Sequence, residues 1–102
     1  MLRLLSITQS EKPEKKFKAT FGETTSKGEN KEKMVHFGQR GSDDYTLTKN
    51  KEQRERYRAR HAKEAKFYNE PTRPATLSRF ILWGDSTSMR ENIKMYKQKF
   101  NL

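Results

Sequence analysis

Residues 34–64 read MVHFGQRGSDDYTLTKNKEQRERYRARHAKE, and the rest of the chain is arranged around this stretch. Its apolar start at 34–37 predicts a strand. Gly38 and Gly41 then favour a sharp turn, because glycine tolerates a positive φ. Asn50 is a suitable N-cap, with Gln53 at the capping-box position. We therefore expect a strand, a turn and a strongly basic helix that ends near residue 68.

The predicted helix carries one aromatic stripe. At about 100° per residue, Tyr57, His61, Ala65 and Tyr68 fall on the same side. This side is expected to be buried, with the two tyrosines and His61 packed on the preceding hairpin and on residues 77–83.

The arginines of the helix follow a different spacing. Arg54, Arg56, Arg58 and Arg60 recur every second residue, so alternate side chains point to nearly opposite sides. Arg54 and Arg58 flank the aromatic stripe, whereas Arg56 and Arg60 point away from it. Such a helix either lies between two partner surfaces or is a solvated helix with salt bridges to its own glutamates.

Upstream, the pattern predicts a β-hairpin. Phe17, Ala19 and Phe21 alternate with polar residues, as in a half-buried strand. Residues 22–33 read as a long polar loop, and 34–37 as the second strand. We expect Phe37 to join the two other phenylalanines in a core-facing cluster.

The first residues are apolar at Leu2, Leu4, Leu5 and Ile7. They form either a strand of the chain's own sheet or an extended arm that pairs with another protein. We expect residues 1–14 to be an N-terminal arm and linker, and residues 15–102 to form a small basic domain. The apolar start is short and is followed by QSEKPEKK, so no signal peptide is expected.

Downstream, residues 69–74 (NEPTRP) contain two prolines, which end the basic helix. Residues 76–83 (TLSRFILW) are the most apolar run in the chain and suit a short helix or a buried strand. Pro74 as a start and Gly84 as a stop favour the helix.

The last predicted helix covers residues 89–100. Ser88 and Glu91 form a capping box at its start. Met89, Ile93, Tyr96 and Phe100 share one face. The fold class is therefore α+β, a small single domain with a β-hairpin followed by about three helices and an extended N-terminal arm. The residues expected to pack internally are Phe17, Phe21, Phe37, Tyr57, His61, Leu77, Phe80, Trp83, Ile93 and Tyr96.

Length and composition allow only a modest core. The chain has 102 residues, of which 30% are hydrophobic and 35% charged. Its mean hydropathy of -1.23 approaches the range in which chains do not fold alone. Six Phe, four Tyr and one Trp counter this with large apolar surfaces. We expect a small folded core that is completed by a partner.

The net charge is +10, from 23 Lys and Arg against 13 Asp and Glu. Such an excess favours acidic protein, nucleic acid or an anionic membrane surface as partner, or simply serves solubility. The chain has no cysteine, which excludes disulfides and cysteine-ligated zinc. No stretch approaches the roughly 18 apolar residues of a transmembrane segment.

Catalytic and metal-binding patterns are weak. His36 and His61 with Asp43 and Asp44 have suitable ligand atoms, but their spacing matches no metal or nuclease motif. Both aspartates lie in a polar turn, where capping is the expected role. We therefore expect no catalytic residue, no metal and no cofactor. The residues expected to contact a partner or an anion are Arg40, Arg54, Arg56, Arg58, Arg60, Lys63, Arg73 and Arg79.

Nucleic-acid binding remains open on the residues alone. Basic side chains interleaved with Tyr and Phe can neutralise phosphates and stack bases. No zinc finger, RNP sequence or GXXG loop is present. Any such binding is expected to be directed at the backbone and sensitive to salt.

Three segments resemble a small protein family of unknown function from large nucleocytoplasmic DNA viruses. They cover 36–64, 69–84 (NEPTRPATLSRFILWG) and 88–100 (SMRENIKMYKQKF). The family pattern is matched by VHFG at 35–38, DYT at 44–46, R-Y-x-x-R-H at 56–61 and LSR-x-x-LW at 77–83. The link at 69–74 departs from the pattern, and the N-terminal MLRLLSI is not part of it.

The resemblance implies a setting rather than an activity. Such viruses build large icosahedral capsids with an internal membrane and packaged DNA. The resemblance implies a minor capsid protein that cements larger capsid proteins beneath the shell, found in the virion and, during assembly, in the host cytoplasm. The alternative is a basic DNA-binding or packaging protein without sequence specificity. An enzyme such as a small nuclease is favoured only by the His and Asp content.

Overall fold

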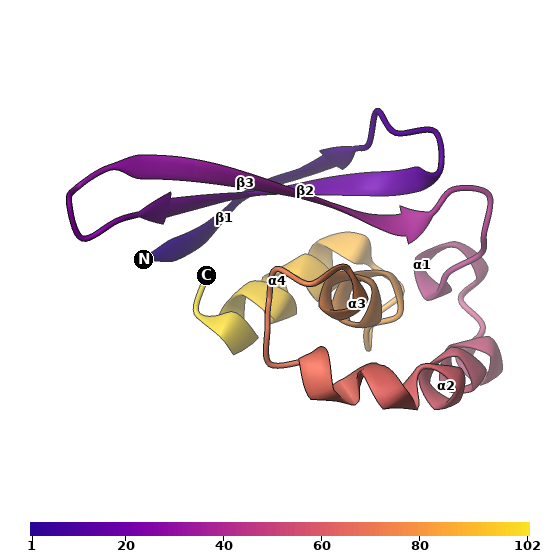
Figure 1. Cartoon of the computed structure of the whole chain (residues 1–102). Helices are drawn as coiled ribbons and strands as arrows, with labels where there is room; N and C mark the ends of the chain where they lie inside the picture. The colour runs from indigo at the N-terminus through magenta and orange to yellow at the C-terminus, as the bar shows by residue number, and fades with distance from the viewer.

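Three strands form one antiparallel sheet in the order β1–β2–β3. The strands are β1 (Leu2–Gln9), β2 (Lys15–Thr24) and β3 (Asn30–Gln39). The computed structural model covers residues 1–102. All the helices lie on one face of the sheet, and the other face is uncovered (Figure 1). The expected α+β class is confirmed.

The register of β2 and β3 follows from their alternating side chains. Phe17 pairs with Phe37, and Ala19 pairs with Val35. The two phenylalanine ring centroids lie 5.9 Å apart. Phe21 and Phe37 are fully buried on the helix-covered face. The predicted phenylalanine cluster therefore forms through cross-strand pairing.

The free N-terminal arm expected for residues 1–14 is wrong. β1 pairs with β2 along its length, with Leu4 opposite Phe21 and Ile7 opposite Ala19. An irregularity between Leu4 and Ser6 lets both Leu4 and Ile7 face the core despite their odd spacing. Burial of these apolar side chains favours a strand of the chain's own sheet, the alternative that the sequence left open.

The long loop expected at 22–33 is also shorter than predicted. β2 continues to Thr24 and β3 begins at Asn30, so only residues 25–29 form the turn. Glu23 lies opposite Lys31, and such opposite charges stabilise paired strands even in a polar sequence. Gly28, with φ of 79°, provides the left-handed residue of the turn.

A short helix, α1 (Tyr45–Thr48), was not expected from the sequence. Asp44 caps it by accepting a hydrogen bond from the Thr46 backbone N–H at 2.9 Å. Asp44 is buried and also accepts a hydrogen bond from Lys16 Nζ at 2.7 Å. This ion pair joins α1 to β2. Tyr45 is buried beneath it.

The basic helix α2 (Lys51–Arg60) is shorter than predicted. Its N-cap is confirmed, since Asn50 Oδ1 accepts a hydrogen bond from the Gln53 N–H at 3.0 Å. After His61 the chain tightens into a 3₁₀ helix, η1 (Ala62–Phe67). The tighter winding leaves Ala65 exposed and turns the Tyr68 ring edge-on against Phe80, 5.6 Å away.

Residues 74–82 are helical, as preferred from their flanking residues. α3 (Pro74–Leu77) begins with proline in its first turn and continues as a π-helical segment, η2 (Ser78–Leu82). The Trp83 N–H donates to the Ser78 carbonyl at 3.0 Å across this wider turn. The wider turn brings the consecutive Ile81, Leu82 and Trp83 all into buried positions.

The final helix, α4 (Met89–Phe100), has the predicted bounds. The Glu91 N–H donates to Ser88 Oγ at 3.2 Å, which confirms Ser88 as N-cap. Tyr96 is buried, while Ile93 is only partly so.

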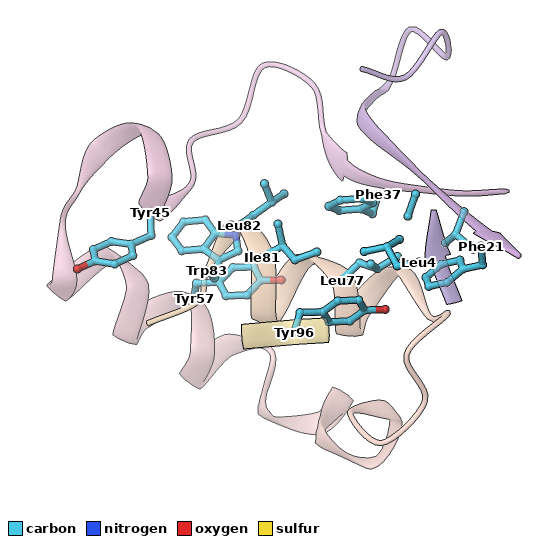
Figure 2. Close-up of a cluster of buried hydrophobic side chains, with 12 residues drawn as sticks. Leu4, Phe21, Phe37, Tyr45, Tyr57, Leu77, Ile81, Leu82, Trp83 and Tyr96 are labelled. Atoms are coloured by element: carbon cyan, nitrogen blue, oxygen red, sulfur yellow. The ribbon is translucent and has the colours of Figure 1, made fainter. Parts of the chain in front are cut away.

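The core lies between the sheet and the helices α2, α3, η2 and α4. In Figure 2 it runs from Tyr45 and the Tyr57–Trp83 pair at one end to Leu4 and Phe21 at the other. The Tyr57 and Trp83 rings stack, with their centroids 4.3 Å apart and an angle of 6° between their planes. Its twelve buried apolar residues are Leu4, Ala19, Phe21, Val35, Phe37, Tyr45, Tyr57, Leu77, Ile81, Leu82, Trp83 and Tyr96.

Candidate functional site

Arg40, one of the eight expected contact residues, binds its own chain. Its guanidinium donates to the backbone carbonyls of Ser10 at 2.7 Å, Lys15 at 3.1 Å and Lys12 at 3.2 Å. These three bonds hold the turn between β1 and β2 against the end of β3. A structural role for Arg40 follows directly from this geometry.

Arg54 and Arg58 also turn inward. Arg58 Nη2 donates to the Trp83 carbonyl at 2.9 Å and to Asp85 Oδ1 at 3.0 Å. This hydrogen bond lowers the pKa of Asp85. The Arg54 guanidinium lies 4.7 Å from the centroid of the Tyr45 ring. Arg54 Nη1 also donates to the Asp85 carbonyl at 3.3 Å, so both arginines fasten α2 to the segment that follows η2.

The outer side of α2 and η1 carries cations of another kind. Arg56, Arg60 and Lys63 are exposed, and none of them forms an ion pair or a hydrogen bond. We call these three residues the outer-helix cations. The two-residue spacing therefore places the arginines on two sides of α2, as predicted. Only Arg56 and Arg60 are exposed to solvent. The other side is occupied by contacts within the molecule.

An open groove of about 690 Å³ lies between the end of the β2–β3 hairpin, α2 and α3. Three aromatic side chains line the groove: Tyr57, His61 and Trp83. The His61 ring stacks on Tyr57, with the two centroids 4.2 Å apart. Lys15 and Arg60 contribute cations. His61 was expected to be internal, and it lies half-buried at this edge of the core.

The groove contains one histidine–carboxylate pair. His61 Nδ1 pairs with Glu64 Oε1 at 2.7 Å, and no hydroxyl hydrogen-bonds to the ring. His36 lies elsewhere, on β3, with its Nδ1 2.7 Å from Ser10 Oγ. Ser10 is buried, and no carboxylate hydrogen-bonds to His36. The serine–histidine contact therefore ties the β1–β2 turn to β3.

The metal-site hypothesis from the sequence finds no matching geometry. No group of three or more His, Asp or Glu side chains lies close enough to hold a metal ion. Asp44 caps α1 and pairs with Lys16, while Asp43 is exposed. None of the helices has the length and apolar content that crossing a bilayer requires.

The last two expected contact residues, Arg73 and Arg79, lie over aromatic rings. Arg73 is 4.6 Å from the Phe67 centroid, and Arg79 is 4.9 Å from the Phe80 centroid. Arg73 also pairs with Glu70 at 3.3 Å. The sequence prediction placed Phe80 inside, yet it is only partly buried.

Two lysines that the sequence prediction omitted join these arginines. Lys66 lies 5.2 Å from the Phe67 centroid, and Lys99 lies 5.2 Å from that of Phe80. The available signal was the direct adjacency of lysine to phenylalanine at 66–67 and 99–100. We call this surface the cation–aromatic strip, formed by Lys66, Phe67, Tyr68, Arg73, Arg79, Phe80, Lys99 and Phe100.

Comparison with known proteins gives a family and no function. No curated protein matches the chain, and no solved structure matches it. One family of unknown function, DUF5754, matches residues 5–61. This match includes most of β1, which the resemblance to viral proteins left out, and stops before the segment 77–83. Because it covers more than half of the 102 residues, the chain belongs to the DUF5754 family.

Proposed function

We propose that the protein is a minor capsid protein, a structural component that cements larger capsid proteins beneath the shell of a large icosahedral double-stranded DNA virus. The viral setting rests on the resemblance of residues 35–38, 44–46, 56–61 and 77–83 to a family from such viruses. The partners are other capsid proteins, and the place of action is the virion after assembly in the host cytoplasm.

The observation that carries the proposal is the set of outer-helix cations. Arg56, Arg60 and Lys63 are exposed and unpaired, while Arg54 and Arg58 of the same helix are bound internally. These free charges, among which Arg60 also lines the groove, suit an acidic surface on a neighbouring protein.

The sheet offers a second contact surface. β1 and β3 are edge strands. β3 carries Lys31, Glu32 and Lys33, charges that disfavour pairing with another strand, whereas the only charged residue on β1 is Arg3. Leu5 of β1 is 51% exposed. An edge with little charge suits the addition of a strand from a capsid partner.

The first test removes two outer-helix cations together. We expect Arg56→Gln with Arg60→Gln to lower incorporation into purified virions at least several-fold, because the acidic partner loses two charge contacts. The melting temperature should stay within about 2 °C, since both side chains are exposed and unpaired.

A matched control removes the same charge elsewhere. Arg90 and Lys94 on α4 are exposed and unpaired, so Arg90→Gln with Lys94→Gln should be incorporated normally. Equal incorporation of both double variants and the parent protein would rule out a role for the outer-helix cations.

Gentle disruption of virions should also leave the protein with the shell. Recovery with the genome instead would contradict cementing.

The second candidate function is DNA binding or packaging without sequence specificity. It is favoured by the net charge of +10 and by the cation–aromatic strip. A protein with this role shifts unrelated DNA duplexes alike, and its affinity falls steeply with salt because it releases counterions. Location of the protein in a map of the intact particle separates the two functions.

A further inference from the structure

We propose that the cation–aromatic strip binds the phosphodiester backbone of nucleic acid. This inference rests on the second candidate function, DNA binding, and is independent of the outer-helix cations. The strip joins η1, η2 and α4, which the ring contacts of Phe80 with Tyr68 and with Phe100 bring together.

The best-formed part of the strip is a small pocket beside Phe80. Its volume is about 270 Å³, and Arg79, Lys99 and Asp85 supply its charged lining. The Arg79 guanidinium and the Lys99 ammonium lie 4.9 and 5.2 Å from the Phe80 ring centroid. One ring thus has two cations beside it that line the same pocket, an arrangement that suits an anionic phosphate group.

Two cations and one carboxylate line this pocket, and the carboxylate, Asp85, is already paired with Arg58. Neither Arg79 nor Lys99 forms an ion pair. Burial and the neighbouring Arg58 lower the pKa of Arg79. The charged guanidinium is therefore less stable here than in water, and a bound anion offsets that cost.

The other end of the strip repeats the arrangement. The Phe67 ring has Lys66 at 5.2 Å and Arg73 at 4.6 Å from its centroid. Arg73 pairs with Glu70, but both side chains are about half exposed, so this surface pair is weak and open to exchange. Two cation pairs on separate rings suit a polymer of phosphates better than a single small anion.

Ring contacts anchor the Phe80 end of the strip. Tyr68 packs edge-on against Phe80 at 5.6 Å, and Phe80 packs edge-on against Phe100 at 6.1 Å. These contacts hold Phe80 against α4 and against Tyr68, the chain neighbour of Phe67. The strip is therefore a preformed surface and not a set of independent flexible lysines.

The same geometry argues against an anionic membrane as the partner. Interfacial binding requires apolar side chains that enter the acyl region. Phe80 and Phe100 are partly buried and lie beneath cations. Met95, at 39% exposed, is the one large exposed apolar side chain of the adjoining pocket.

The test compares two double variants of the full chain that lose equal charge. Arg79→Gln with Lys99→Gln alters the strip, whereas Arg56→Gln with Arg60→Gln alters the outer-helix cations. Binding to a single-stranded and a duplex oligonucleotide is measured by fluorescence anisotropy from 50 to 300 mM salt, a general range for backbone-directed binding. We expect the strip variant to bind about ten-fold more weakly than the parent protein. The slope of log binding constant against log salt concentration for the duplex should become less steep by about 0.9 per lost phosphate contact.

Each outcome decides a separate point. Equal weakening by both double variants would mean diffuse attraction and would overturn the strip as a site. If the parent protein binds neither oligonucleotide, the second candidate function fails together with the strip. Stronger binding to phosphatidylserine vesicles than to oligonucleotides would also overturn the proposal. If Arg79→Gln unfolds, the exposed Lys99 still tests the strip: Lys99→Gln alone should weaken binding more than Arg56→Gln does, and equal weakening would overturn the strip.

Discussion

At the scale of single residues, Asn92 is the polar group on which the helix layer depends. Its side chain is fully buried. Nδ2 donates to the carbonyls of Ile81 at 2.9 Å and Ser86 at 2.8 Å, and Oδ1 accepts from the Ser86 N–H at 2.9 Å. Close packing leaves no space beside it, because a Cβ on Gly84 would lie 2.7 Å from the Asn92 side chain. Asn92 thus satisfies three backbone groups, one at Ile81 in η2 and two at Ser86 in the link to α4.

We expect Asn92→Leu to destabilise the protein by about 2–4 kcal/mol, because three buried backbone groups lose their hydrogen-bond partner. The free energy of unfolding from urea denaturation measures this. Lys94→Leu, an exposed position on the same helix, should change stability by less than about 0.5 kcal/mol. An unchanged urea midpoint for Asn92→Leu would contradict the role assigned to these hydrogen bonds.

Sequence patterns could indicate that Asn92 faces the core, but not why. It lies between Met89 and Tyr96 on the apolar side of α4. Its partners are backbone atoms of Ile81 and Ser86, whose positions depend on the π-helical turn and on Gly84. No pattern in one sequence reports such a tertiary arrangement. For the same reason, the inward contacts of Arg40 and Arg58 were not foreseen.

At the scale of helices and strands, local signals were sufficient where the structure is local. The caps Asn50 and Ser88, the bounds of α4 and the alternation of Phe17 with Phe21 follow from short-range chemistry. Two elements depended on distant residues instead. β1 is fixed by pairing with β2, and η1 departs from the α-helical period as Tyr68 packs on Phe80.

Helix α1 has only four residues, so its stability comes from its attachment to β2. Asp44 provides that attachment through the Thr46 N–H and the Lys16 ammonium. We expect Asp44→Ala to reduce the free energy of unfolding by about 2–4 kcal/mol, because it removes the N-cap and leaves a mostly buried lysine unpaired.

The neighbouring Asp43 provides the control, since it is exposed and has no ion pair. Asp43→Ala should lie within about 0.5 kcal/mol of the parent protein. Comparable losses for the two variants would show that the turn's general charge matters, and not the Asp44–Lys16 pair.

At the scale of the whole molecule, the small core contains two tyrosines whose ionisation is disfavoured by burial. Burial raises the pKa of Tyr57 and of Tyr96. In the unfolded chain both ionise near pH 10. The contribution of the two neutral tyrosines to the free energy of unfolding is therefore fully present below about pH 10. Above that pH the unfolded state loses protons that the folded state keeps, so this contribution decreases.

We expect stability to fall above pH 10 by up to about 1.4 kcal/mol per pH unit for each of these tyrosines. Thermal melts at pH 9 and pH 11 measure the loss. Tyr57→Phe should lose less stability than the parent protein between the two pH values, and adding Tyr96→Phe should reduce the loss further. An identical drop in all three proteins would assign the alkaline loss to other groups.

The antiparallel order β1–β2–β3 also has a consequence for synthesis. Each strand pairs with its neighbour in sequence, so short loop closures are enough to form the sheet. The last strand ends at Gln39, while the residues that cover its inner face begin at Pro74. On the ribosome the sheet can therefore form well before its cover. Until α3 and α4 emerge, Phe21 and Phe37 present an apolar surface that chaperones or other chains can bind.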